Sequence, residues 1–282
     1  MPEILEFFIF ITTFIIITYI LLSLVVFFVL TNNPILWRKG TSNFPFPITL
    51  KYINDNKTAY WIHNQENSKG WVILLHYYVG KSESMAERGK FYLDNGYSLL
   101  LVDGPSHGLT KFSWRATAVH YSTTVLEIIE KEKIANPILH GVSFGSTACL
   151  FLSKMVIYKA LILESSTYSI KNIFWSLFHY IHIPKWLFGW IPYVIFFRYR
   201  NFDWERNNPS NLLRFVDAPI LIFHTKKDNI FDYERHAEIF RKIFSSNNYD
   251  YGRFITIEDT THTEINKSPV WEETINTLLS EI

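Results

Sequence analysis

The chain has 282 residues, and its 27 lysines and arginines nearly balance its 26 aspartates and glutamates, which leaves a formal net charge of +1. This balance excludes a nucleic-acid partner that is bound by a basic stripe neutralising a row of phosphates. A hydrophobic content of 48% is enough for one large domain with a full core. The single cysteine, Cys149, excludes an intramolecular disulfide.

Residues 1–40 are predicted to form a membrane anchor and its flank. Phe7 to Leu30 contains no charged residue, and at about 1.5 Å per residue such a helix would span roughly 36 Å, more than the ~30 Å core of a bilayer. A cleaved signal peptide is the alternative, but Glu3 and Glu6 precede the run and no small-residue cleavage site follows it. The basic flank Trp37-Arg38-Lys39 predicts a single-pass membrane protein whose remaining chain is cytoplasmic.

The remaining chain, residues 41–282, predicts one α/β domain. Residues 41–47 are polar and proline-punctuated and indicate a linker. Two β-prone runs, 48–53 and 59–63, flank a turn-forming cluster and predict a hairpin. Six short apolar runs predict strands buried on both faces, at 71–75, 98–102, 138–139, 160–163, 220–223 and 254–257. Helical stretches lie at 84–95, 117–133, 147–157, 233–245 and 269–282. This alternation predicts a mostly parallel, eight-stranded sheet with helices on both faces, which binds ligands at the carboxyl ends of its strands.

The motif Gly141-x-Ser143-x-Gly145 lies between a predicted strand and a predicted helix. A sharp turn from strand to helix holds the serine in a strained backbone conformation, and a side chain at either glycine would collide with the neighbouring strand or helix. The Ser143 hydroxyl would then stand clear of the sheet at the positive end of the helix, where a negatively charged intermediate is stabilised. The motif therefore predicts a nucleophilic serine.

A nucleophilic serine needs a base to remove its proton and an acid to orient that base. In the chain order serine, acid, histidine, the qualifying histidines are His224, His236 and His262. His224 lies within a predicted strand and His236 within a predicted helix, which favours structural roles for both. His262 follows the run 254–257 at the carboxyl end of the sheet, so it is the predicted base.

The predicted acid is Asp228, which follows the strand 220–223. Asp217 precedes that strand and would lie at the wrong end of the sheet. The alternative role for Asp228 is that of a solvated loop aspartate beside two lysines. Glu164, at the end of an earlier strand, is the reserve candidate.

These motifs, in this order, resemble the serine hydrolases of the α/β-hydrolase family over about residues 48–282. In that family, backbone amides after the third strand and after the nucleophile form the oxyanion hole, which the resemblance assigns to Tyr78 and Phe144. The chain departs from the family pattern at Tyr77, where glycine is usual. Residues 103–110 are similar to a structural turn of the family. The resemblance implies the α/β-hydrolase fold and neither a metal nor an organic cofactor.

The aromatic segment 168–211 lies where lipases, esterases, thioesterases and acylglycerol hydrolases of that family carry a helical cap. The resemblance makes Phe174, Trp175, Trp186 and Trp190 candidates for substrate binding. One interpretation is that these side chains pack over the sheet. The other is that they form an apolar acyl pocket, or a surface that dips into the bilayer beside the anchor.

The expected function is therefore that of a membrane-anchored serine hydrolase acting on acyl esters, of lipids or of other apolar substrates. A thioesterase, a peptidase or an acyltransferase would use the same residues and is an open alternative. A noncatalytic, membrane-tethered scaffold of the same fold is the alternative from another class. The expected partners are an ester substrate and the bilayer, and the sequence does not determine the oligomeric state.

Overall fold

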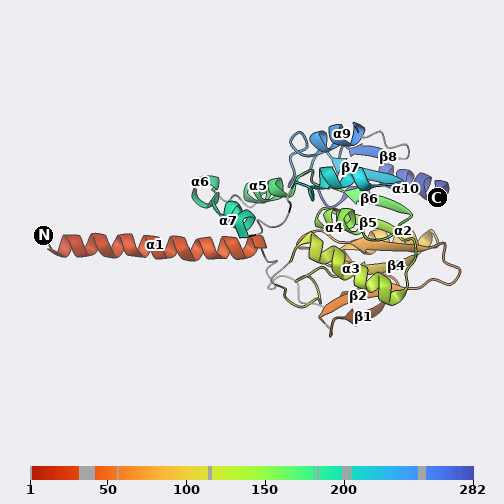
Figure 1. Ribbon diagram of the computed structural model, residues 1–282, viewed down its shortest axis with the longest axis horizontal. Coiled ribbons are helices and arrows are strands. Elements are labelled where there is room, and N and C mark those ends of the chain that lie inside the picture. The colour runs from red at the N-terminus through yellow and green to blue at the C-terminus, as the bar shows by residue number, and fades with distance from the viewer. Residues whose placement is uncertain are drawn as a thin grey trace.

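The computed structural model describes residues 2–31, 42–55, 57–113, 116–180, 182, 184–198, 203, 205–246 and 252–282. A long N-terminal helix, α1 (Pro2–Thr31), projects from an α/β domain (Figure 1). Within Glu3–Phe28 an 18-residue window of this helix has a mean hydropathy of 2.7, so its length and composition suit a membrane-crossing helix, and a signal sequence equally. Residues 37–39, on which the predicted orientation depends, lie outside the described residues.

Eight strands form one sheet in the order β1-β2-β4-β3-β5-β6-β7-β8. β2 is antiparallel to β1 and β4, and the remaining pairs are parallel. The strands are β1 (Thr49–Ile53), β2 (Thr58–His63), β3 (Trp71–Leu75), β4 (Ser98–Val102), β5 (Ile138–Val142), β6 (Ala160–Glu164), β7 (Ile220–Thr225) and β8 (Gly252–Ile257). The carboxyl ends of the parallel strands meet at one edge, where ligands bind in such sheets.

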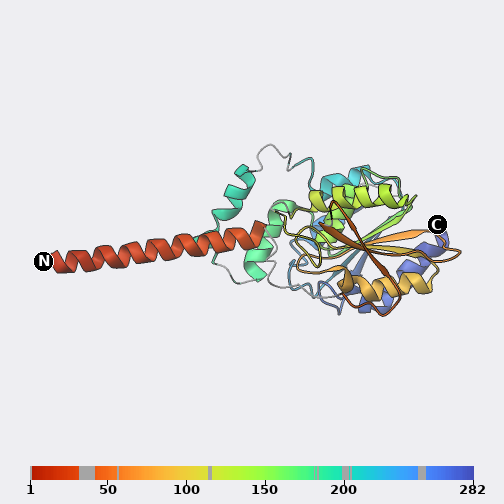
Figure 2. The ribbon, with the colours of Figure 1, turned by 90° about the horizontal axis from the view of Figure 1, so that it is seen from below.

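Helices cover both faces of the sheet (Figure 2). One face carries α3 (Ala118–Glu132), α4 (Phe144–Leu152) and α9 (Ala237–Ser245), and the other carries α2 (Ala86–Asp94) and α10 (Pro269–Glu281). In β3, Ile73 and Leu75 belong to one buried cluster and Val72 and Leu74 to the other, and all are fully buried. Burial on both faces explains why the strands are continuous apolar runs. The predicted fold class is confirmed.

Some element boundaries differ from the predicted ones. α4 begins at Phe144 rather than at Thr147, because the turn at Ser143 leads directly into the helix, and the glycine of that turn weakens the local helical signal. α9 begins at Ala237 rather than Tyr233. Short 3-10 turns, η2 (Ser82–Met85), η3 (Leu213–Phe215) and η4 (Ile265–Lys267), complete the described elements.

The predicted linker is not purely a spacer. Phe44 packs against Trp61 of β2, with ring centroids 5.6 Å apart, and Phe46 joins the same buried cluster. The start of the domain therefore contributes to its core.

An insertion between β6 and β7 includes the helices α5 (Ile170–Tyr180), α6 (Lys185–Phe188), α7 (Ile191–Arg198) and α8 (Pro209–Leu212). We call α5, α6 and α7 the cap. Buried cap side chains form a third cluster, separate from the two on the sheet, and Val26 of α1 belongs to it; the cap members are Phe178, Phe188, Ile191 and Ile195. The N-terminal helix is thus part of the core of the cap.

Candidate active site

Ser143 lies in the turn between β5 and α4, with φ 53° and ψ −106°. Such a backbone costs a non-glycine residue about 1–3 kcal/mol and is found where the surroundings enforce it. A Cβ atom on Gly141 would lie 2.3 Å from the carbonyl group of Gly145. A Cβ atom on Gly145 would lie 2.0 Å from the carbonyl oxygen of Leu75. The turn therefore lies so close to the neighbouring backbone that glycine is required at both positions.

Hydrogen bonds to β6 hold this turn in place. The Ser143 N–H donates to the carbonyl oxygen of Glu164 at 2.8 Å. The Ser146 hydroxyl lies 2.6 Å from the carbonyl oxygen of Gly141 and 2.7 Å from that of Glu164. The first N–H groups of a helix have no acceptor within it, so the N-terminus of α4 carries a partial positive charge. The partly exposed Ser143 side chain lies at this end of the helix.

His262 and Asp228 contact each other although 34 residues separate them. Nδ1 of His262 lies 2.7 Å from Oδ2 of Asp228, and both side chains are 2% exposed. Oδ1 of Asp228 accepts from the N–H groups of Ile230 and Phe231 at 2.8 and 2.7 Å. Burial raises the pKa of Asp228, but His262 and these N–H groups outweigh it, and the pKa lies below its usual value. The carboxylate is therefore ionised at neutral pH and orients the imidazole.

The other imidazole nitrogen of His262, Nε2, is buried and has no hydrogen-bond partner. Buried polar atoms in proteins are nearly always paired, so an unpaired one calls for an explanation, and contact with a substrate or reacting group is one such explanation. Two further contacts hold His262. Phe231 meets its ring edge-on with centroids 5.0 Å apart, and the Ser165 hydroxyl donates to its backbone carbonyl at 2.6 Å.

Tyr78 and Phe144, the predicted oxyanion-hole residues, lie on neighbouring segments. Tyr78 is in the loop after β3 and Phe144 is the first residue of α4, and their rings meet edge to face at 5.7 Å. The next residue of the loop, Val79, has φ 67°, a left-handed conformation that a β-branched residue rarely adopts. Its N–H donates to Nε2 of His107 at 3.3 Å.

The turn at residues 103–110 has the structural role that the resemblance implied. The buried carboxylate of Asp103 accepts from the N–H groups of Ser82 and Leu109 at 2.7 and 2.6 Å. Burial nevertheless raises the pKa of Asp103 to about 6. A Cβ atom on Gly108, which has φ 51°, would lie 1.9 Å from this carboxylate. Asp103 therefore ties two loops together.

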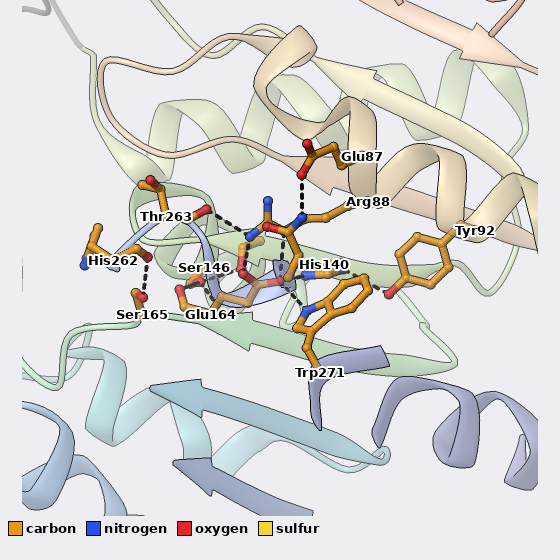
Figure 3. A network of polar contacts seen from close by, with 12 residues as sticks. Glu87, Arg88, Tyr92, His140, Ser146, Glu164, Ser165, His262, Thr263 and Trp271 are labelled. Atoms are coloured by element: carbon orange, nitrogen blue, oxygen red, sulfur yellow. Dashed lines mark hydrogen bonds and ion pairs between the residues drawn. The ribbon is translucent and has the colours of Figure 1, made fainter. Parts of the chain in front are cut away.

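Glu164, the reserve candidate for the acid, is engaged by other partners (Figure 3). Its fully buried carboxylate accepts from Nε and Nη2 of Arg88, and it lies 2.8 Å from Nε2 of His140 and 2.7 Å from Nε1 of Trp271. Burial raises the pKa of Glu164, but Arg88 outweighs burial and the pKa falls to about 2. Among the described residues, Asp228 is the acid that contacts His262.

This buried network reaches the loop that carries His262 (Figure 3). Nη2 of Arg88 donates to the carbonyl oxygen of Thr263 at 3.2 Å, next to His262. The hydroxyl of Tyr92 lies 2.9 Å from Nδ1 of His140 and extends the network under the sheet. No local sequence pattern singles out Arg88. The available signal was weak: a histidine and a glutamate inside apolar strands.

The other two histidines have structural surroundings. His224 is buried in β7, its ring stacks on Phe254 at 5.4 Å, and burial lowers its pKa to about 3. His236 lies just before α9, and its Nε2 is 2.9 Å from the hydroxyl of Ser176 in α5. No group of three or more His, Cys, Asp or Glu side chains suited to a metal ion occurs in the part of the chain that the structure describes.

The cap candidates occupy different environments. Trp175 packs against Phe178 within the cap, with ring centroids 5.9 Å apart. Trp186, in α6, is 86% exposed. Nε1 of Trp190 donates to the hydroxyl of Tyr19 in α1 at 2.8 Å. The side chain of Phe174 lies outside the described residues.

Solved structures with the same architecture are numerous. An esterase from Pyrococcus furiosus is 18% identical, with a TM-score of 0.66 over 89% of this chain and 97% of that one. The alpha/beta hydrolase domain-containing protein 10 from mouse is 13% identical, with a TM-score of 0.59 over 84% and 99%. An esterase from Exiguobacterium antarcticum is 17% identical, with a TM-score of 0.59 over 82% and 99%. No family profile and no curated protein sequence matches the chain. At these identities the likeness is one of architecture, and the chain has the α/β-hydrolase fold.

Proposed function

We propose that the protein is a membrane-anchored serine hydrolase that cleaves acyl esters. Ser143 is the nucleophile, His262 the general base and acid, and Asp228 the residue that orients His262. The observation that carries the proposal is the 2.7 Å contact between Asp228 and His262, which leaves the buried Nε2 of His262 unpartnered at the edge of the sheet that carries Ser143.

In the proposed reaction, Nε2 of His262 accepts the Ser143 proton as the oxygen attacks the acyl carbonyl carbon. The N–H groups of Tyr78 and Phe144 hold the resulting oxyanion. His262 then gives the proton to the leaving alkoxide, and a water molecule hydrolyses the acyl-enzyme by the same steps. The ionised Asp228 stabilises the imidazolium that forms in each step.

We propose a lipid or another apolar ester as the substrate. The supporting feature is the aromatic cap inserted after β6, in which Phe174, Trp175, Trp186 and Trp190 are the candidates for acyl-chain contact. Residues 1–40 are the proposed anchor and its flank, and residues 41–282 the hydrolase domain, with its cap insertion at about 168–211. The domain is proposed to face the cytoplasm.

A fluorophosphonate probe, which reacts only with an activated serine, tests the proposal. The wild-type chain in detergent should be labelled and should hydrolyse a p-nitrophenyl ester, and Ser143→Ala should abolish both. Ser280→Ala, at an exposed serine of α10, is the matched control and should change neither. A folded wild-type chain that resists labelling would favour the noncatalytic scaffold. Thioesterase, peptidase and acyltransferase activities share the same residues, and a substrate screen separates them.

A further inference from the structure

Tyr19 lies within the apolar run of α1 and contacts the cap. Its hydroxyl donates to the backbone carbonyl of Leu187 and accepts from Nε1 of Trp190, both at 2.8 Å, and its ring stacks on Phe188. α6 has only four residues, and its first carbonyl, that of Lys185, accepts from the Gly189 N–H of the helix end, whereas the Leu187 carbonyl near the end of the helix accepts from Tyr19. Tyr19 thus satisfies two polar groups of the cap. Such internal pairing is required where no water is present.

The position of Tyr19 along α1 determines the depth of the cap. The uncharged run begins at Phe7, directly after Glu6. About 20 residues cross the ~30 Å hydrocarbon core, so the embedded part ends near Phe27. At ~1.5 Å per residue, Tyr19 is about 18 Å from Phe7. It therefore lies about 12 Å below the near surface of the hydrocarbon, which is the surface that faces the α/β domain. A cap that contacts Tyr19 reaches the same depth.

The cap presents large apolar side chains beside this part of α1. Trp186, Tyr193 and Val194 are 86%, 65% and 42% exposed. Most side chains of α1 between Ile4 and Val25 are apolar and exposed as well. Both views of the ribbon show α7 alongside the C-terminal half of α1 (Figures 1 and 2). Soluble proteins rarely leave a continuous apolar surface of this extent uncovered.

The charges of α6 and α7 lie at the ends of these helices. Lys185 is the first residue of α6 and Arg198 the last residue of α7, and the sequence between the ends of each helix is uncharged. The Lys185 ammonium group lies 6.0 Å from the centre of the Trp175 ring. A long basic side chain can extend toward the lipid headgroups while its stem stays in the apolar layer, so the position of Lys185 is compatible with insertion.

We infer that α6, α7 and the C-terminal half of α1 form one unit that lies within the near leaflet of a bilayer. The partner of the exposed apolar face is the acyl chains of the lipids. This inference rests on the proposed membrane anchor, but not on the proposed chemistry at Ser143. Because Val26 belongs to the core of the cap, the helix holds the domain in one orientation on the membrane.

This placement specifies the class of substrate. Phe28 of α1 stacks on Phe112, with centroids 6.3 Å apart, in the loop that follows His107. The His107 ring stacks in turn on Phe144, beside Ser143, at 5.7 Å. Two aromatic contacts, one at each end of residues 107–112, therefore lie between the candidate nucleophile and the point where α1 leaves the hydrocarbon. An amphiphilic ester in the near leaflet fits, since its ester group reaches Ser143 while its acyl chain stays among the lipids.

Fluorescence quenching in liposomes tests the depth of the cap. Cys149 is buried, so a single cysteine introduced by Trp186→Cys, Phe14→Cys or Lys90→Cys can be labelled selectively in the full chain. Phe14 lies on the exposed side of α1, and Lys90 is exposed on α2 of the α/β domain. The liposomes contain phosphatidylcholine brominated in the middle of its acyl chains. The label at position 186 should lose as much fluorescence as the label at 14, and the label at 90 should lose none.

Quenching at 14 without quenching at 186 would overturn the inference and leave the hydrolase proposal standing. Fluorophosphonate labelling of the wild-type chain in the same liposomes tests that proposal separately. Quenching at 186, together with a wild-type chain that the probe fails to label, would support the inference and contradict the hydrolase proposal. Chain-to-chain cross-linking through position 186, without quenching, would assign the apolar face to a second copy of the chain and overturn the inference. Absence of quenching at 14 as well would overturn the anchor and the inference together.

A second variant tests the contact itself. Tyr19→Phe removes one hydroxyl and leaves the Leu187 carbonyl and the Trp190 N–H without partners. Trypsin should then cleave at Lys185 faster in liposomes than it cleaves the wild type. Thr12→Val removes a hydroxyl from an exposed position of the same helix and should behave like the wild type. Equal cleavage of Tyr19→Phe and the wild type would show that Tyr19 does not hold the cap, and would overturn the one-unit inference.

Discussion

Replacing Asp228 with asparagine should leave the fold intact and remove nearly all ester hydrolysis. Oδ1 of Asp228 accepts from the N–H groups of Ile230 and Phe231, while Oδ2 faces Nδ1 of His262 at 2.7 Å. An asparagine keeps its carbonyl oxygen toward the two N–H donors, so its NH2 group takes the place of Oδ2. Since that group only donates, Nδ1 must accept and the imidazole proton moves to Nε2.

The protonated Nε2 cannot accept the proton of Ser143. Loss of the correct tautomer in a triad lowers kcat by about 10,000-fold, which corresponds to about 5.5 kcal/mol on the barrier at ~1.36 kcal/mol per factor of ten. Backbone hydrogen bonding to the side chain is preserved, so the unfolding midpoint in urea should change little. The defect should therefore appear in the rate and not in the stability.

The assay compares initial rates on a p-nitrophenyl ester and rates of fluorophosphonate labelling for the wild type and the variant. Asp232→Asn is the matched control, because Asp232 is exposed and its carboxylate accepts only from the N–H of Arg235 among the contacts that the structure describes. It should retain full activity. An Asp228→Asn variant with more than about a tenth of the wild-type rate would refute the tautomer argument.

Glu164→Gln should destabilise the fold by about 3–5 kcal/mol, because it leaves the buried Arg88 charge uncompensated. In the wild type, the pKa of Glu164 is lowered from 4.5 to about 2, so this stabilisation is complete above pH 4.5 and is lost as the pH falls toward 2; urea unfolding across that range should show the loss in the wild type but not in the variant. Gly145→Ala should cost at least about 1–3 kcal/mol, measured in the same way, because its Cβ would overlap the Leu75 carbonyl. In sealed vesicles with the cytoplasmic side inside, the domain should resist added protease. Digestion of the domain from outside would show that it faces the opposite side of the membrane. On p-nitrophenyl esters, kcat/KM should rise from acetyl to octanoyl, with binding gaining up to about 0.8 kcal/mol per methylene; a preference for acetyl would contradict a lipid substrate.

The strands could be predicted from the sequence because burial on both faces turns each one into a short apolar run. The runs at 71–75 and 98–102 coincide with β3 and β4. The position of β4 between β2 and β3 could not be predicted in this way, since an apolar run carries no information about which neighbour it pairs with. Helix starts are obscured in the sequence where turn residues precede them, as at Phe144.

The candidate residues Asp228 and His262 were selected because each follows a strand, and the structure brings them into contact. Their catalytic roles stay predictions. The network around Glu164 depends on Arg88, which is 76 residues away in the sequence, and the contact of Tyr19 with Leu187 spans 168 residues. Local patterns do not encode such pairings. The sequence shows only that a polar residue stands in an apolar element, Tyr19 within α1 and Glu164 at the end of β6, and it does not show the partner of either.

The arrangement of the sheet has a consequence for folding kinetics. β8 is the edge strand and pairs only with β7 among the described strands, and the hydroxyl of Thr225, at the end of β7, donates to the Thr260 carbonyl in the loop after β8 at 2.5 Å. Parallel pairing between distant segments forms slowly, and β8 joins the sheet only through β7, which itself pairs with β6 across the 59 residues from Leu161 to Ile220. The turn at Ser143 depends on central strands of the sheet, whereas the contact between Asp228 and His262 depends on the edge strand β8 and its neighbour β7. During refolding, recovery of ester hydrolysis should therefore lag behind the far-UV circular dichroism signal and mark completion of the last strand pair.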